Sequence, residues 1–376
     1  MRCKLVCILL ACLLLALPAL AEEAETDLPT VLGLKVVEGS TSLYLRSLSQ
    51  VSKQQAQQLI EELRAFPEVT EVDLRGVTVD RDGQTALMEA YPGIHFRWEV
   101  SVGGAYVNGD ITELDLDALG IKTSTALSEI RKALACLPKL ERVTMFSFIN
   151  SMDEMERLLK DFPQIHFDWT LHTRPFTKGR TVDWRTDATA FSTMKSVQMT
   201  PRYTADGIMK YLQYMPDLLA IDVGHNNVSD LSFLLHWPNL RRLICVDSTK
   251  RLTDISPLAE LMDLEYVELF LQDITDISPL ANHTKLLDLN LCHNDVTDLS
   301  PLYSRTSLER LHISYNPHLT AEEVAKLQEA LPNCVIETET YQSTGAGWRE
   351  HPRYFTMYKS FEDQVYYPFE DEEHAD

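Results

Sequence analysis

Residues 264–281 read LEYVELFLQDITDISPLA, and this pattern returns along the chain at a nearly fixed interval. Each copy follows L-x-x-L-x-L-x-x-N-x-I, with Ile, Val or Cys at some apolar positions. The spacings between copies are 22, 24, 22 and 22 residues, and the opening leucines are Leu218, Leu240, Leu264, Leu286 and Leu308. The L-x-L alternation predicts a short strand with one apolar face. Because one such unit cannot bury that face alone, we expect the repeats to stack into a solenoid.

The turn after each predicted strand carries an amide or hydroxyl side chain that can bond to main-chain groups. The residues at this position are Asn226, Ser248, Gln272, Asn294 and Asn316. Stacked amides predict a ladder, which we expect to be weaker where Ser248 and Gln272 replace Asn.

A second recurrent signal is an Asp followed two residues later by Ser, and in three of its four copies Pro-Leu comes directly after the Ser. The recurring acids are Asp230, Asp254, Asp276 and Asp298. Ser-Pro-Leu is typical of a short helical turn, with Ser as N-cap and Pro at the first helical position. These are structural signals, and they point to no chemistry.

The motif Thr-Asp-Ile-Ser-Pro-Leu-Ala at 253–259 and 275–281 resembles the internalin-type leucine-rich repeats of Gram-positive surface and secreted proteins, over residues 218–337. The resemblance implies a curved array whose concave strand face binds protein ligands. The chain departs from that family in lacking its wall-anchoring modules, which leaves attachment to a cell in doubt.

The N-terminal half carries a longer repeat, because residues 43–99 recur at 114–170 with an offset of 71. The matched pairs include Leu43 with Leu114, Leu45 with Leu116, Pro67 with Pro138, Val72 with Val143, His95 with His166 and Trp98 with Trp169. Each unit reads as strand, helix, strand, helix, strand, with helical spacing at 51–66 and 124–137. A further helix is expected over 205–214.

We therefore predict an α/β solenoid, a leucine-rich-repeat horseshoe with irregular longer N-terminal repeats and a C-terminal helical cap. Its expected parts are a signal peptide (1–21), a linker (22–34), degenerate long repeats (35–217), regular repeats with their cap (218–337) and a tail (338–376), with 35–337 forming one solenoid. Thr320 and Glu323 predict a capping box that opens the terminal helix. The tail, acidic at its end, is similar to one in secreted repeat proteins of Firmicutes.

The first 21 residues have the pattern of a secretory signal peptide: a basic start (Arg2, Lys4), an apolar run (5–17) and small residues for cleavage (19–21). A second interpretation is lipid attachment at Cys12, which follows Leu-Leu-Ala. Both interpretations place the protein outside the cytoplasm, secreted or tethered, and no later segment is apolar and long enough to predict a membrane span.

The net charge, the cysteine spacing and the motif content argue against several partners and reactions. The formal net charge is −22, and removal of Arg2 and Lys4 with the signal peptide makes it −24. Such a charge repels phosphate and anionic lipid, so nucleic acid and membrane surfaces are not expected partners. Outside the signal peptide, the cysteines lack C-x-x-C spacing and are expected to be packed thiols: Cys136, Cys245, Cys292 and Cys334. No cofactor, metal or nucleophile motif occurs, so we expect no enzyme activity and no cofactor.

Strand alternation places the third, fifth and seventh residues of each repeat on the concave face. There an apolar centre with a charged rim is typical of a protein-binding patch. The predicted ligand-binding residues are Arg242, Ile244, Tyr266, Glu268, Phe270, Asp288, Asn290, Arg310 and His312. The alternative is that the C-terminal tail folds back and covers these residues.

The leading hypothesis is a monomeric extracellular protein that binds a protein ligand through this face. The alternative is a glycan or cell-envelope binding module, since aromatic rings stack on sugars; the rings in question are Trp98, Trp169, Tyr266 and Trp348. A hydrolase is a third hypothesis.

The recurring histidines are expected to be structural. His225 and His293 lie three repeats apart, too far for one metal, and Cys292 and His312 are out of register for a nucleophile–base pair. His95 and His166 are expected to face outward and to mark the duplication.

Overall fold

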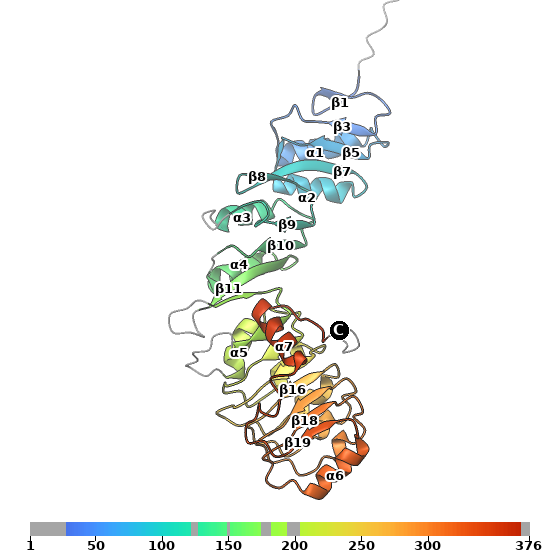
Figure 1. Ribbon diagram of the computed structural model, residues 1–376. Coiled ribbons are helices and arrows are strands. Elements are labelled where there is room, and N and C mark those ends of the chain that lie inside the picture. The colour runs from blue at the N-terminus through green and yellow to red at the C-terminus, as the bar shows by residue number, and fades with distance from the viewer. Residues whose placement is uncertain (1–27, 122–126, 149–150, 174–181, 194–203, 370–376) are drawn as a thin grey trace, which may run out of the picture. The chain divides into compact units, whose positions relative to one another are not determined.

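Figure 1 shows the computed structural model, which describes residues 28–121, 127–148, 151–173, 182–193 and 204–369. The predicted signal peptide, with Cys12, lies outside these residues. Within them no helix is both long and apolar enough to cross a bilayer.

The chain divides into two compact units. Unit 1 comprises Met1–Ser101, Tyr106–Asp110 and Ala135–Pro138, and unit 2 comprises Val102–Ala105, Ile111–Leu134 and Lys139–Asp376. The predicted boundary at residue 217 and the continuous solenoid over 35–337 stay predictions.

Unit 1 contains the first copy of the 71-residue repeat, in the predicted order of strand, helix, strand, helix, strand. The elements are β3 (Ser42–Tyr44), α1 (Lys53–Leu63), β5 (Glu71–Leu74), α2 (Arg81–Ala90) and β7 (His95–Val102). Strands β3, β5 and β7 pair in parallel, with Leu43, Val72 and Phe96 in one row. The sheet order is β3-β5-β7-β8, with β8 at Ala105–Asn108.

The two helices of unit 1 pack closely at Gly83 in α2. A Cβ atom at this position would lie 2.8 Å from the Cβ of Ala56 in α1. Two small residues therefore allow the helices to approach. The remaining short strands are β1 (Thr30–Val31) with β2 (Leu34–Lys35), and β4 (Gln50–Val51) with β6 (Thr78–Val79).

Unit 2 begins with the second copy of the repeat. Its elements are β9 (Glu113–Asp115), α3 (Leu127–Leu134), β10 (Arg142–Met145), α4 (Met152–Asp161) and β11 (His166–Thr173). Strands β9, β10 and β11 are parallel, as in the first copy. An antiparallel strand, β12 (Val182–Arg185), pairs with β11.

The regular repeats form a seven-stranded parallel sheet, with its strands in sequence order. These strands are β13 (Ala190–Ser192), β14 (Ala220–Asp222), β15 (Arg242–Ile244), β16 (Tyr266–Glu268), β17 (Asp288–Asn290), β18 (Arg310–His312) and β19 (Val335–Glu337). The five strands predicted from the leucine spacing and the last strand at 335–336 are confirmed. The first strand, β13, was not predicted.

Side-chain amides join neighbouring repeats at the turns after β14, β16, β17 and β18. Asn294 donates to the carbonyl of Leu269 (2.9 Å) and accepts from the amide of Ile274 (3.0 Å). Gln272 makes the same pair of bonds one repeat earlier, to Cys245 O (3.0 Å) and from Leu252 N (2.8 Å). The longer side chain of Gln272 thus keeps the ladder continuous, but Asn294 also donates to the carbonyl of Leu291 in its own repeat (3.1 Å), a bond that Gln272 does not match among the described residues. The expectation that the ladder is weaker at Gln272 stays a prediction.

Short 3-10 helices follow strands β14 to β17, and each contacts the next one along the chain. They are η2 (Ser232–His236), η3 (Ser256–Glu260), η4 (Ser278–Leu280) and η5 (Ser300–Leu302). The predicted Ser cap is wrong, because Ser256 is already the first helical residue and Pro257 the second. The Asp two residues earlier acts instead, with Asp254 accepting from Ser256 N at 2.8 Å.

Two helices flank the regular repeats. The predicted helix at 205–214 is α5 (Ala205–Leu212), and the predicted C-terminal cap is α6 (Ala321–Ala330). Thr320 caps α6 by accepting from Glu323 N at 3.2 Å. The return half of the predicted capping box is replaced, since the Glu323 carboxylate accepts from Leu299 N (3.1 Å) and Tyr303 OH (2.6 Å).

Candidate ligand-binding site

The predicted site residues share one face of the parallel sheet. Register pairs Tyr266 with Arg242 and Asp288, and it pairs Glu268 with Ile244 and Asn290. Arg310 and His312 continue the two rows on β18, and Phe270 follows β16. The concave placement therefore follows from the register of strands β15 to β18.

The predicted exposure of this face is wrong. Eight of the nine predicted residues are buried, and Arg310 is mostly so. The cover is the chain's own C-terminal segment, residues 341–369, which contains α7 (Pro352–Asp363). This segment brings Trp348, Met357 and Phe361 into one apolar cluster with the concave face. In Figure 1 the red α7 lies against the strands of the array.

The reason for the cover lies in the composition of both surfaces. Ile244, Tyr266 and Phe270 would leave an apolar patch in water if the strands faced solvent. The Trp348 ring lies with its centroid 5.9 Å from that of Tyr266, and Tyr354 and Phe369 also pack against the cluster. This arrangement matches the alternative raised from the sequence, in which the C-terminal tail folds back and covers the concave face.

Two buried acids of the concave face, Glu268 and Asp288, are paired with arginines. Glu268 accepts from Arg349 (3.1 Å) and from the Trp348 indole nitrogen (2.8 Å). Asp288 accepts from Arg310 (2.5 Å) and from Arg353 (3.2 Å). Charge-assisted bonds of this kind offset the cost of removing the carboxylates from water.

Arg242 and Asn290 are also bound by the C-terminal segment. Arg242 donates to Ser360 Oγ at 3.2 Å and to the carbonyl of Tyr367 at 2.5 Å, and its guanidinium stacks on Phe369. Asn290 donates to the carbonyl of Ser343 at 2.7 Å. The concave face thus binds a peptide segment, which here belongs to the same chain.

The C-terminal segment does not fill the concave face completely. A cavity of about 730 Å³ remains between the sheet and α7. It lies within the range of about 300–1,000 Å³ common for ligand pockets. Its walls are formed on the sheet side by Ser192, Asp222, His225, Ile244, Val246 and Phe270, and on the other side by Ser343, Thr344, Arg349, Tyr354, Met357, Tyr358, Phe361 and Glu362.

Asp222, the last residue of β14, is the buried acid of this cavity. Its carboxylate accepts from Ser192 Oγ at 2.6 Å and from Gly224 N at 3.0 Å. Burial raises the pKa of Asp222 above its ordinary value, and these two hydrogen bonds oppose the rise. Burial therefore makes the charged form of Asp222 costly.

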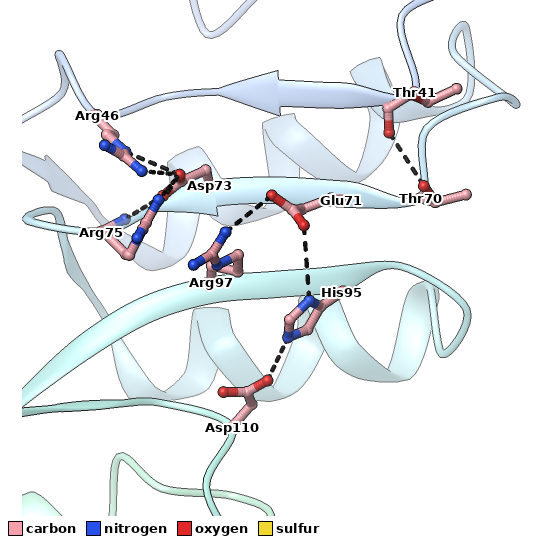
Figure 2. Close-up of polar contacts among 9 residues, drawn as sticks. All are labelled: Thr41, Arg46, Thr70, Glu71, Asp73, Arg75, His95, Arg97 and Asp110. Carbon is pink, nitrogen blue, oxygen red and sulfur yellow. Dashed lines mark hydrogen bonds and ion pairs between the residues drawn. The ribbon is translucent and has the colours of Figure 1, made fainter.

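The strand face of unit 1, by contrast, carries mainly polar side chains. Figure 2 shows Asp73 between Arg46 and Arg75, with Arg75 Nη2 2.7 Å from its carboxylate. Glu71 pairs with Arg97 at 3.4 Å, and His95 contacts Asp110. Tyr44 on the same sheet is 67% exposed, so no comparable apolar cover occurs here within the described residues.

The residues considered for other chemistry do not form a metal-binding group or a nucleophile–base pair among the described residues. Burial raises the pKa of Cys292 to about 11 and lowers that of His312, and no hydrogen bond joins these two described side chains. His225 pairs with Asp247, while His293 contacts the carbonyl of Tyr341. No group of three His, Cys, Asp or Glu that could hold a metal occurs among the described residues.

Three further expectations concern the recurring histidines, the aromatic rings and the cysteines. His95 and His166 face outward as predicted, with about half of each side chain exposed. The aromatic faces invoked for glycan stacking are buried, which removes the observation behind that hypothesis: Trp98, Trp169, Tyr266 and Trp348. The four cysteines in the described part of the chain are free thiols: Cys136, Cys245, Cys292 and Cys334.

Several residues of the cavity were not chosen from the sequence. Asp222 occupies the fifth position of its repeat, a concave position, but sequence alone gives no reason to select it. Arg349, Met357 and Phe361 lie in the tail, and no local pattern says where a tail will dock. A usable signal was the coincidence of an aromatic and basic tail with an apolar and acidic strand face.

Parallel strands in register, amide-bearing turns and 3-10 helices together define the array of unit 2 as a leucine-rich-repeat solenoid with a helical cap. Comparisons with known proteins add the following. No protein-family model matches the chain, and no curated protein matches it.

Solved structures similar to the chain include two internalins and one leucine-rich-repeat protein. Internalin C2 of Listeria monocytogenes is 23% identical, covers 42% of this chain and 76% of its own, and has a TM-score of 0.29. Internalin F of the same species is 15% identical over 79% of this chain and 82% of its own, with a TM-score of 0.35. A leucine-rich-repeat protein of Leptospira interrogans is 13% identical over 77% and 81%, with a TM-score of 0.34.

Proposed function

We propose that this protein is an extracellular, non-catalytic binding protein that takes a segment of another protein into the cavity between the concave strands and α7. The observation that carries the proposal is the cavity of about 730 Å³, which combines apolar walls with convergent polar groups. The predicted residues Ile244 and Phe270 line it directly. The other seven predicted residues support it by holding the C-terminal segment that forms its second wall.

The concave face has the chemistry needed to bind a peptide. Its arginines, acids and aromatic rings already bind backbone and side-chain groups of the C-terminal segment, as Arg242 and Asn290 do at carbonyl oxygens. Aromatic residues and arginines are also the residue types that dominate protein-binding sites. A ligand segment entering the cavity would extend this mode of recognition to another chain.

The proposal is tested by crosslinking from the mouth of the cavity. Tyr358 is 59% exposed and lines the cavity, so a photoreactive benzophenone amino acid there reports on an occupant. We expect a saturable crosslink to one protein from the culture medium or a host surface. Thr344→Trp, which places a large ring in the cavity, should abolish the crosslink.

The matched control is Gln342→Trp, because Gln342 is exposed on the same loop and does not line the cavity. This variant should crosslink as the unsubstituted protein does. A crosslink that survives Thr344→Trp, or no saturable crosslink in either source, would refute the proposal. Binding on a glycan array that Thr344→Trp removes would replace the protein ligand with a sugar.

A further inference from the structure

The concave face contains three buried acids, and only two of them are paired with a cation. Glu268 is bound by Arg349, and Asp288 by Arg310 and Arg353. Asp222 is 5% exposed, yet no Lys, Arg or His nitrogen of the described residues lies within salt-bridge distance of its carboxylate. It occupies the same position of its repeat as Glu268, so the two acids make an internal comparison.

Two hydrogen bonds leave part of the Asp222 carboxylate unused. An ionised carboxylate has about four acceptor sites, and the donors to Asp222 are Ser192 Oγ and Gly224 N. A buried charge without a counterion is costly and is characteristic of functional sites. Glu268 and Asp288 each pair with a guanidinium group, whereas Asp222 lines the cavity.

From this contrast we infer that the cavity binds an organic cation, an ammonium or guanidinium group on an apolar stem, with Asp222 as its counterion. The inference rests on the proposed function and names the ligand chemistry of the same site. Ile244, Val246 and Met357 offer apolar walls for the stem. Arg349 also lines this cavity, but its ion pair is with Glu268, and it acts on Asp222 only from beyond ion-pair distance.

The aromatic lining favours the same chemistry. Tyr354, Tyr358 and Phe270 border the cavity, and ring faces attract cations that have left water. A metal ion fits less well, because the described residues include no cluster of three ligands. The ammonium group can belong to a lysine in a protein segment or to a free diamine.

The test compares ligands that differ in one charge. The probes are acetyl-Ala-Lys-Ala-amide, its norleucine analogue without the ammonium group, and 1,5-diaminopentane. Binding is followed by NMR from the methyl signals of Ile244, Val246 and Met357. We expect the lysine peptide to bind about tenfold or more tightly than the norleucine peptide, since a charge-assisted bond is lost in the second.

The preference should disappear in Asp222→Asn and persist in Asp217→Asn, an exposed acid directly before the same repeat. Tighter binding of the diamine than of the lysine peptide would identify a free amine as the ligand. Equal binding of the lysine and norleucine peptides would overturn the inference and leave the proposed function standing. Failure of all three probes to shift the methyl signals would also overturn it, while the crosslinking experiment decides the proposed function separately.

Discussion

The strand face of unit 1 and the concave face of the regular repeats are built by the same alternation but end in different surroundings. In unit 1 the outward positions hold Glu71, Asp73 and Arg97, which pair with charged neighbours beside an exposed Tyr44. In the regular repeats they hold Ile244 and Tyr266, which the C-terminal segment buries. Alternation therefore fixes which residues share a face, and their polarity decides whether the face needs a cover.

The largest expected effect comes from removing aromatic rings on the two faces. Tyr266→Ser with Phe270→Ser should lower the melting temperature of unit 2 by more than about 10 °C, because each ring lost from a core costs about 3–5 kcal/mol. Tyr44→Ser should change the stability of unit 1 by less than about 0.5 kcal/mol, as is usual for an exposed position. Differential scanning calorimetry measures both.

The control for this comparison is the pair of conservative changes Tyr266→Phe and Tyr44→Phe, which keep both rings. A double Ser variant with the same melting temperature as the unsubstituted protein would mean that the concave face is open in solution. The concave face would then be the exposed apolar patch that the sequence predicts.

Breaking one ion pair on each face should give the next largest difference. Asp288→Asn leaves Arg310 and Arg353 beside each other in a buried site, and we expect a loss of about 3 kcal/mol or more. Glu71→Gln leaves the partly exposed Arg97 near water, and we expect about 0–1 kcal/mol. Urea denaturation followed by circular dichroism resolves this difference.

Equal losses in these two variants would contradict the distinction between a covered and an open face. Raising the salt concentration supplies an independent check, because screening weakens exposed pairs more than buried ones. The Glu71–Arg97 pair should therefore respond to salt, and the Asp288 cluster should respond little.

The repeat periodicity was sufficient to predict most of the fold. Leu218, Leu240, Leu264, Leu286 and Leu308 fix strands β14 to β18, since each apolar position must face the shared core. The 71-residue offset likewise predicted the order of elements in both copies. The predicted Ser256 cap was wrong, because a residue pattern does not fix the exact residue at which a short helical turn begins.

The candidate site was predicted only in part, for a physical reason. Strand alternation places Ile244 and Phe270 on the concave face, and both line the cavity. What occupies that face depends on a segment about a hundred residues away in sequence, and no local pattern reports such a contact. Asp222 stands out only in the structure, where Glu268 and Asp288 pair with arginines and Asp222 has no such ion pair among the described residues.

The smallest expected effect concerns Asp222 and has a defined dependence on pH. Burial raises its pKa in the folded protein, with Glu268 adding to the rise and Arg349 opposing it. His225 and Glu362 line the same cavity. The folded state therefore holds the Asp222 proton more tightly than the unfolded state, so this group contributes stability below about pH 4 that is lost as the pH rises.

Asp222→Asn removes this dependence, so the variant should gain stability relative to the unsubstituted protein as the pH rises from about 4 to 7. Each kcal/mol corresponds to about 2–4 °C in the melting temperature of a unit of this size. Melting curves at several pH values test this, with Asp217→Asn as the control. An Asn variant that instead loses stability toward neutral pH would show that Asp222 already has a counterion, and the cavity would then need no cationic ligand.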